Sequence, residues 1–151
     1  MVLAALLFAA SVGAAQAYWT YAQWGMTETQ LMAASGGQAV PCRPDVPVCA
    51  PPPGGAVPSH YVESLTMVGM PASAAFAFDG QGQLNQTAVL FPRTDSELMS
   101  GLLGGIHGEA VEGRPGDPTS RFWRDQRRGS LLTVIPAGLG VWLLYRPAPA
   151  P

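Results

Sequence analysis

The chain has 151 residues, of which 48% are hydrophobic and 12% are charged, and its formal net charge is −2. A chain of this length suits one domain and can bury a core without a metal ion or several disulfides. The charge is too balanced to point to nucleic acid or an anionic membrane as the main partner, and we expect no nucleic-acid binding.

Residues 1–17 are predicted to be a secretory signal peptide. This apolar run ends in Ala15-Gln16-Ala17, the small-x-small pattern that signal peptidase accepts. The run is shorter than the roughly 20 apolar residues of a membrane span, although an uncleaved anchor is the alternative. Tyr18 rather than Cys follows the expected cleavage point, which argues against a lipid anchor. All 8 basic residues are Arg, a bias that is typical of proteins from GC-rich bacterial genomes. With the signal peptide, this leads us to expect a periplasmic or secreted bacterial protein with no integral membrane span in the mature chain.

A first short helix is expected at about residues 28–35. Thr27 and Gln30 form a capping box, which satisfies free backbone N–H groups at the start of a helix. Two glycines follow, and glycine readily takes the left-handed conformation that ends a helix. The aromatic segment before the helix, which contains Trp24, is expected to pack onto the domain.

Residues 38–59, here called the proline-rich segment, contain seven prolines and both cysteines. Proline excludes regular helix and central strand, so we expect a surface loop. It is either a variable insertion, the interpretation we favour, or a binding loop. In an exported protein Cys42 and Cys49 are predicted to form a disulfide. A redox pair, or half of a metal site completed by the two histidines, are the alternatives.

The rest of the chain alternates between strand and helix patterns. Three strands with alternating apolar residues are expected at 61–68, 74–79 and 84–91. A second helix is expected at about 95–107, capped by a box of Thr94 and Glu97. Three further strands are expected at 121–125, 130–135 and 141–145, followed by a Pro/Ala tail at 147–151. The predicted fold class is therefore α+β, with one domain at 18–146 built from two short helices, each followed by about three antiparallel strands (tandem αβββ units).

Two short motifs carry a resemblance to a known family. They are the helix start Trp24-Gly25-Met26-Thr27 with Gln30, and the hairpin Phe76-Ala-Phe-Asp79 followed by Leu84. The chain resembles the small envelope domains of the BamE/SmpA and beta-lactamase-inhibitor-protein type, over most of residues 24–146. The resemblance implies a noncatalytic role in protein binding or envelope assembly, with no catalytic residues to carry over.

No catalytic motif stands out, and we expect a protein that is not an enzyme and has no cofactor or metal. His60 and His107 are the only histidines. His60 follows Ser59, but neighbouring residues of a strand point to opposite faces, so we expect no Ser–His dyad there. His107 is expected at the end of the second helix, where the helix dipole stabilises a cation.

One local concentration of arginines and aromatics, at residues 121–128, is the candidate binding region. Alternation along the strand divides it between two faces, and an exposed hairpin tip without a partner is the alternative interpretation. The region would contact an envelope protein or an anionic envelope component, such as lipopolysaccharide, peptidoglycan or an acidic protein surface. Exposed tryptophans would serve as interface anchors. The expected interface residues are Arg121, Trp123, Arg124, Arg127, Arg128 and Trp24. The alternative function is binding of a small apolar ligand or lipid in a cavity lined by Phe76, Phe78, Leu102 and Trp142.

Overall fold

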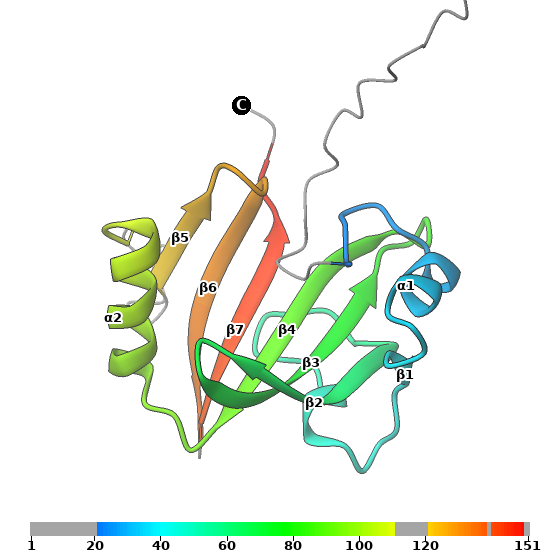
Figure 1. Cartoon of the computed structure of the whole chain (residues 1–151), viewed down its shortest axis with the longest axis horizontal. Coiled ribbons are helices and arrows are strands. Elements are labelled where there is room, and N and C mark those ends of the chain that lie inside the picture. Colours follow the sequence, from blue (N-terminus) through cyan, green and yellow to red (C-terminus); the bar gives the residue numbers. More distant parts are fainter. Residues whose placement is uncertain (1–20, 111–120, 139, 150–151) are drawn as a thin grey trace, which may run out of the picture.

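The structure is a computed structural model that describes residues 21–110, 121–138 and 140–149. The expected signal peptide at residues 1–17 lies outside these ranges. The described chain contains two α-helices, one short 3-10 helix and one seven-stranded antiparallel sheet (Figure 1).

Six of the strands are long, and all of them lie where the alternating pattern predicts a strand. In chain order, the strands are β1 (Val40–Pro41), β2 (His60–Met67), β3 (Met70–Phe78), β4 (Leu84–Pro92), β5 (Arg121–Asp125), β6 (Ser130–Ala137) and β7 (Gly140–Pro147). Their order across the sheet is β1-β2-β3-β4-β7-β6-β5. The first half of the chain therefore forms one side of the sheet and the second half forms the other.

The fold class predicted from the sequence, two tandem αβββ units, is wrong. β4 pairs with β7 from Thr87↔Tyr145 to Pro92↔Gly140, so both halves of the chain belong to one hydrogen-bonded sheet. The two-residue strand β1 adds a seventh member at the outer edge of β2. The fold is one continuous sheet to which two helices are added, because pairing between strands distant in sequence joins the halves.

Both helices begin with side-chain caps. α1 spans Glu28–Ala34, and the predicted capping box is confirmed: Thr27 Oγ1 accepts a hydrogen bond from the Gln30 amide at 3.3 Å, and Gln30 Oε1 accepts one from the Thr27 amide at 2.9 Å. α2 spans Ser96–His107, but its cap is Asp95 rather than Thr94. The Asp95 carboxylate accepts from the amides of the second and third helical residues at 2.8 and 3.2 Å. The capping residue of α2 therefore lies one position after the predicted one.

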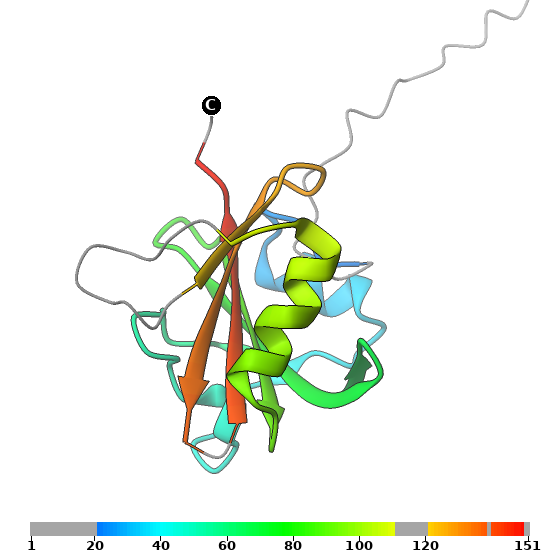
Figure 2. The ribbon, with the colours of Figure 1, turned by 90° about the vertical axis from the view of Figure 1, so that its left-hand side faces the viewer.

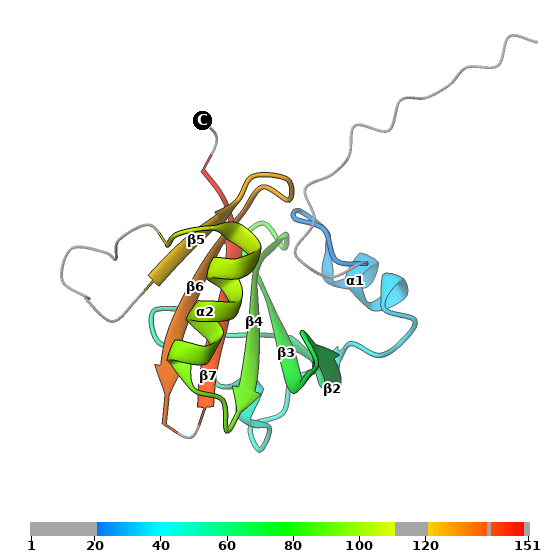
Figure 3. The same ribbon diagram turned by 60° about the vertical axis from the view of Figure 1, so that its left-hand side comes forward.

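The front face of the sheet carries the main core. α2 packs across β5, β6 and β7, while α1 contributes Leu31 at the other end of the sheet (Figures 1 and 3). The largest buried side chains between these layers include Phe76, Phe91 and Tyr145, which come from both halves of the sheet. The front core is thus continuous over the join between β4 and β7.

The back face is covered by the proline-rich segment. This segment contains β1 and the 3-10 helix η1 (Pro47–Cys49), which contacts β2, β3 and β4. Val48 of η1 is only 1% exposed and packs in a second cluster with Tyr61, Ala75, Ala88, Trp142 and Leu144. Further along the segment, Ala56 exchanges two hydrogen bonds with the Gln86 side chain, at 2.9 and 3.1 Å. The segment is a structural layer of the domain, a role that a surface insertion does not have.

Candidate functional site

A groove lies where the end of α2 meets the turn between β5 and β6. It has a volume of about 540 Å³, and we call it the arginine groove. The residues that line it are Ile106, His107, Arg124, Asp125, Gln126, Arg127 and Arg128. It therefore draws on three of the four arginines in the sequence-predicted cluster.

The turn at the groove is held by a carboxylate. Asp125 closes β5, and its Oδ1 accepts a hydrogen bond from the Arg128 amide at 3.2 Å. Its Oδ2 lies 3.8 Å from a guanidinium nitrogen of Arg128. The Asp125 side chain is 9% exposed, so this pair fixes the turn and neutralises one of the arginines.

The remaining charge of the groove is positive. Arg124 and Arg127 are exposed, and neither makes an ion pair within the described ranges. Three arginines against one carboxylate leave an excess of positive charge. His107 in the last turn of α2 is on the same wall. The C-terminal carbonyls of a helix favour cations nearby, which explains why the arginines are tolerated together.

The arginine and aromatic residues are divided between different surroundings, as alternation along the strand predicts. Arg121 lies at the opposite end of α2, where its guanidinium nitrogen is 3.3 Å from Glu97 Oε1. Trp123 is 2% exposed, and its Nε1 donates a hydrogen bond to the Gly108 carbonyl at 3.1 Å. Trp123 thus ties the end of α2 to β5 from inside, beneath the groove. Alternation along β5 places Trp123 on the front core while Arg124 points out.

Trp24 is half-buried at a second, more open hollow. Its Nε1 donates a hydrogen bond to Ser130 Oγ at 3.1 Å, which links the N-terminal segment to β6. The hollow has a volume of about 470 Å³ and is lined by Gln23, Trp24, Gly25, Met26, Gln30 and Ala33. Trp142 is buried in the back cluster. Across the described ranges, therefore, no tryptophan is exposed as a free interface anchor.

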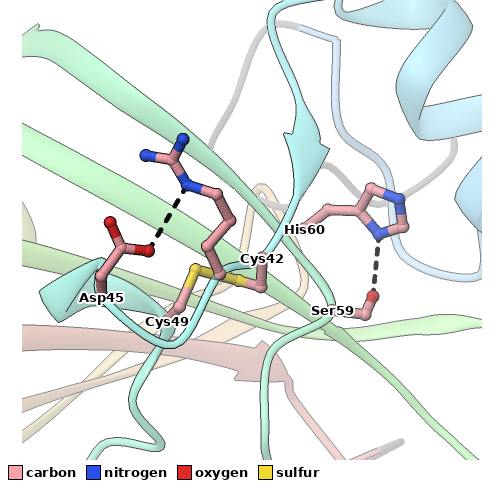
Figure 4. The surroundings of a disulfide bond; sticks show 6 residues. Cys42, Asp45, Cys49, Ser59 and His60 are labelled. Atoms are coloured by element: carbon pink, nitrogen blue, oxygen red, sulfur yellow. Dashed lines mark hydrogen bonds and ion pairs between the residues drawn. A yellow bond between two sulfur atoms is a disulfide. The ribbon is translucent and has the colours of Figure 1, made fainter.

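The two cysteines are joined, so the predicted disulfide is confirmed. Cys42 and Cys49 have a Cα–Cα separation of 5.6 Å and close a short loop over the back face (Figure 4). On the outside of this loop Arg43 and Asp45 form an exposed ion pair at 3.6 Å. The bridge holds η1 in the conformation in which Val48 points into the protein.

Ser59 and His60 meet, contrary to the expectation from strand alternation. Ser59 Oγ lies 2.9 Å from His60 Nδ1 (Figure 4). Strand β2 begins at His60, so Ser59 lies outside the pleat and the alternation rule does not apply to it. His60 is buried, with its ring edge on Phe78 at a centroid distance of 6.1 Å. The pair gives Nδ1 of a buried histidine a hydrogen-bond partner and is a packing feature.

The four residues expected to line an apolar cavity do not share one space. Phe76 belongs to the front cluster, whereas Trp142 belongs to the back cluster on the other side of the sheet. Phe78 and Leu102 are half-buried at different ends of the molecule, on β3 and α2. A sheet therefore separates residues that the cavity hypothesis brings together.

None of the described helices has the length and apolarity to cross a membrane. No family model matches the chain, and neither a curated protein nor a solved structure matches it. The resemblance to BamE/SmpA-type envelope domains stays a prediction that rests on its short motifs. The arginine groove is thus the candidate site on structural grounds alone.

Proposed function

We propose that the protein is an exported, noncatalytic binding domain that holds an anionic group of an envelope partner in the arginine groove. The observation that supports this is the pair Arg124 and Arg127, two exposed arginines without an ion pair in the described ranges, which are among the residues that line a groove of about 540 Å³. Guanidinium groups bind carboxylate and phosphate in a bidentate manner. The groove offers this chemistry on a rigid support, because Asp125 fixes the turn.

The noncatalytic part of the proposal rests on the kind of groups in the groove. Guanidinium groups keep their charge and position an anion, but they do not exchange protons as a general acid or base does. Asp125 is engaged with Arg128 through both carboxylate oxygens. The groove residues other than His107 therefore favour recognition over proton transfer.

Export is supported by the disulfide and by the N-terminal pattern. A disulfide such as Cys42–Cys49 is compatible with an oxidising compartment, where disulfides persist. The apolar run at residues 1–17 provides the expected route to that compartment. Together they favour a periplasmic or secreted protein that meets envelope components.

An NMR titration of the ¹⁵N-labelled mature chain tests the site. The probes are pyrophosphate and a triglutamate peptide, which separate a phosphate from a carboxylate source. We expect shift changes confined to residues 106–107 and 124–128. The double variant Arg124→Gln/Arg127→Gln is expected to bind at least about tenfold more weakly, since charge-assisted hydrogen bonds are lost.

The matched control is the double variant Arg43→Gln/Arg93→Gln, which removes the same charge from arginines outside the groove. It should bind both probes like the unaltered chain. Equal weakening in both double variants would mean that net charge alone attracts the anion, and the proposed site would then be wrong.

A further inference from the structure

His107 is the group of the arginine groove that can gain or lose a charge near neutral pH. It stands in the last turn of α2, at the end of the helix that lies beside the turn between β5 and β6 (Figure 2). Its side chain is half-buried, and within the described ranges its imidazole makes no hydrogen bond or ion pair. Histidine ordinarily changes its charge between about pH 5 and 8, whereas arginine stays cationic. The groove therefore has one wall that is either neutral or positive.

The charged groups that face His107 come from β5 and from the turn that follows it. They are Arg124, Asp125, Arg127 and Arg128. Strand β6 contains no charged residue, and Arg146 of β7 donates a hydrogen bond to the proline-rich segment on the back face. Glu109, two residues beyond His107, is exposed and does not line the groove. Because Asp125 is paired with Arg128, the groove retains the charge of two arginines.

An anion held by Arg124 and Arg127 would meet His107 on the wall that α2 supplies. A protonated imidazole adds a third positive charge there, together with a donor for a charge-assisted hydrogen bond. A neutral imidazole adds no charge, and only one of its nitrogens donates. The carbonyl groups at the end of α2 stabilise the added cation. Protonation of His107 and binding of an anion therefore favour each other.

We infer that His107 makes anion binding in the arginine groove depend on pH, so that the groove holds its anion more tightly in acidic than in alkaline surroundings. The inference rests on the proposed function, since it requires an anion in the groove. The sign follows from the charge, because the protonated form at low pH attracts the anion and this attraction is lost as the pH rises. One charge-assisted hydrogen bond corresponds to a change in affinity of about tenfold.

An NMR titration of the ¹⁵N-labelled mature chain with sulfate, at about pH 5.5 and about pH 8, tests the inference. Sulfate keeps both of its negative charges at either pH, so at constant ionic strength a change in affinity comes from the protein. The unaltered chain should bind sulfate about tenfold more tightly at the lower pH. The shift changes should be confined to residues 106–107 and 124–128.

Two variants fix the charge at position 107. His107→Gln should bind sulfate at both pH values as weakly as the unaltered chain does at the higher pH. His107→Arg should bind it at both as tightly as the unaltered chain does at the lower pH. A merely structural role of His107 would weaken binding in both variants alike. The matched control is Glu109→Gln, which removes a titratable group outside the groove and should keep the full pH dependence.

The outcomes separate this inference from the proposed function. Equal affinity of the unaltered chain at both pH values, or a pH dependence that persists in His107→Gln, would overturn the inference and leave the groove as an anion site. If sulfate shifts none of the groove amides at either pH, the proposed function is wrong, and this inference is wrong with it.

Discussion

The two faces of the β-sheet are covered by different kinds of structure. The front face packs against two α-helices through large side chains that include Phe76, Phe91 and Tyr145. The back face packs against the proline-rich segment, whose only regular elements are β1 and the three-residue helix η1. Both layers bury apolar surface, but the back layer does so with almost no secondary structure of its own.

The residues beneath each layer explain the difference. On the back face Ala75 and Ala88 are direct neighbours on β3 and β4, and both are fully buried beneath η1. Because these side chains are small, a segment without an α-helix can approach the sheet closely enough for the Val48 side chain to fill the space above them. The disulfide then limits the conformations of the loop in the unfolded state. A cross-linked loop can replace a helix as a layer where two small side chains on neighbouring strands let it approach the sheet.

The largest expected effect comes from the front face. Phe76→Ala removes a fully buried aromatic ring from the front core and should lower the free energy of unfolding by about 3–5 kcal/mol. Urea unfolding of the two proteins measures the change. Phe78→Ala, at the half-buried end of the same strand, is the comparison and should cost about 1–2 kcal/mol. Equal losses would mean that the front core is less tightly packed than the structure indicates.

Loss of the disulfide should have a smaller effect, and it should be local. Cys42→Ser/Cys49→Ser opens a short loop, which should lower the free energy of unfolding by about 2–3 kcal/mol. Hydrogen exchange should show lost protection at residues 42–49, while the amides of α2 on the front face keep theirs. If α2 loses protection to the same extent, the two faces form one cooperative unit, and the distinction between them fails.

Local features were predictable from the sequence, whereas contacts between distant segments were not. The α1 capping box, the six long strands and the disulfide each depend on residues within about ten positions of one another, and all are confirmed. The β4–β7 pairing joins strands about fifty residues apart, and no local pattern records it. The packing site for Val48 includes alanines from two other strands, so the sequence of the proline-rich segment alone predicts an insertion.

The candidate site divides in the same way. The sequence predicted the arginines, because they are adjacent along the chain, but it could not show that α2 supplies the other wall of their groove. It also could not assign Trp123, because alternation gives two faces without saying which one is the core. The Gly108 carbonyl that accepts from Trp123 belongs to the end of the helix that packs there.

Removal of two methyl groups on the back face should have a moderate effect on stability. Val48→Ala removes the side chain that η1 places over Ala75 and Ala88, and it should lower the free energy of unfolding by about 1–2 kcal/mol. Val57→Ala is the matched control, since Val57 lies in the same proline-rich segment and is 73% exposed. It should leave stability unchanged within experimental error. A Val48→Ala variant as stable as this control would show that packing of Val48 on the sheet does not contribute to the free energy of unfolding.

The smallest effect concerns the N-terminal cap of α2, the helix that packs on the front face. Asp95→Ala removes the cap of α2, leaving the amides of Glu97 and Leu98 without their side-chain acceptor, and should cost about 1 kcal/mol. Thr94→Ala is the matched control, because Thr94 is the cap that the sequence alone suggests, yet its hydroxyl only donates to the Pro92 carbonyl at 3.4 Å. It should therefore change stability little, as judged by thermal and urea unfolding. The reverse order of the two variants would restore the sequence-predicted register of the helix.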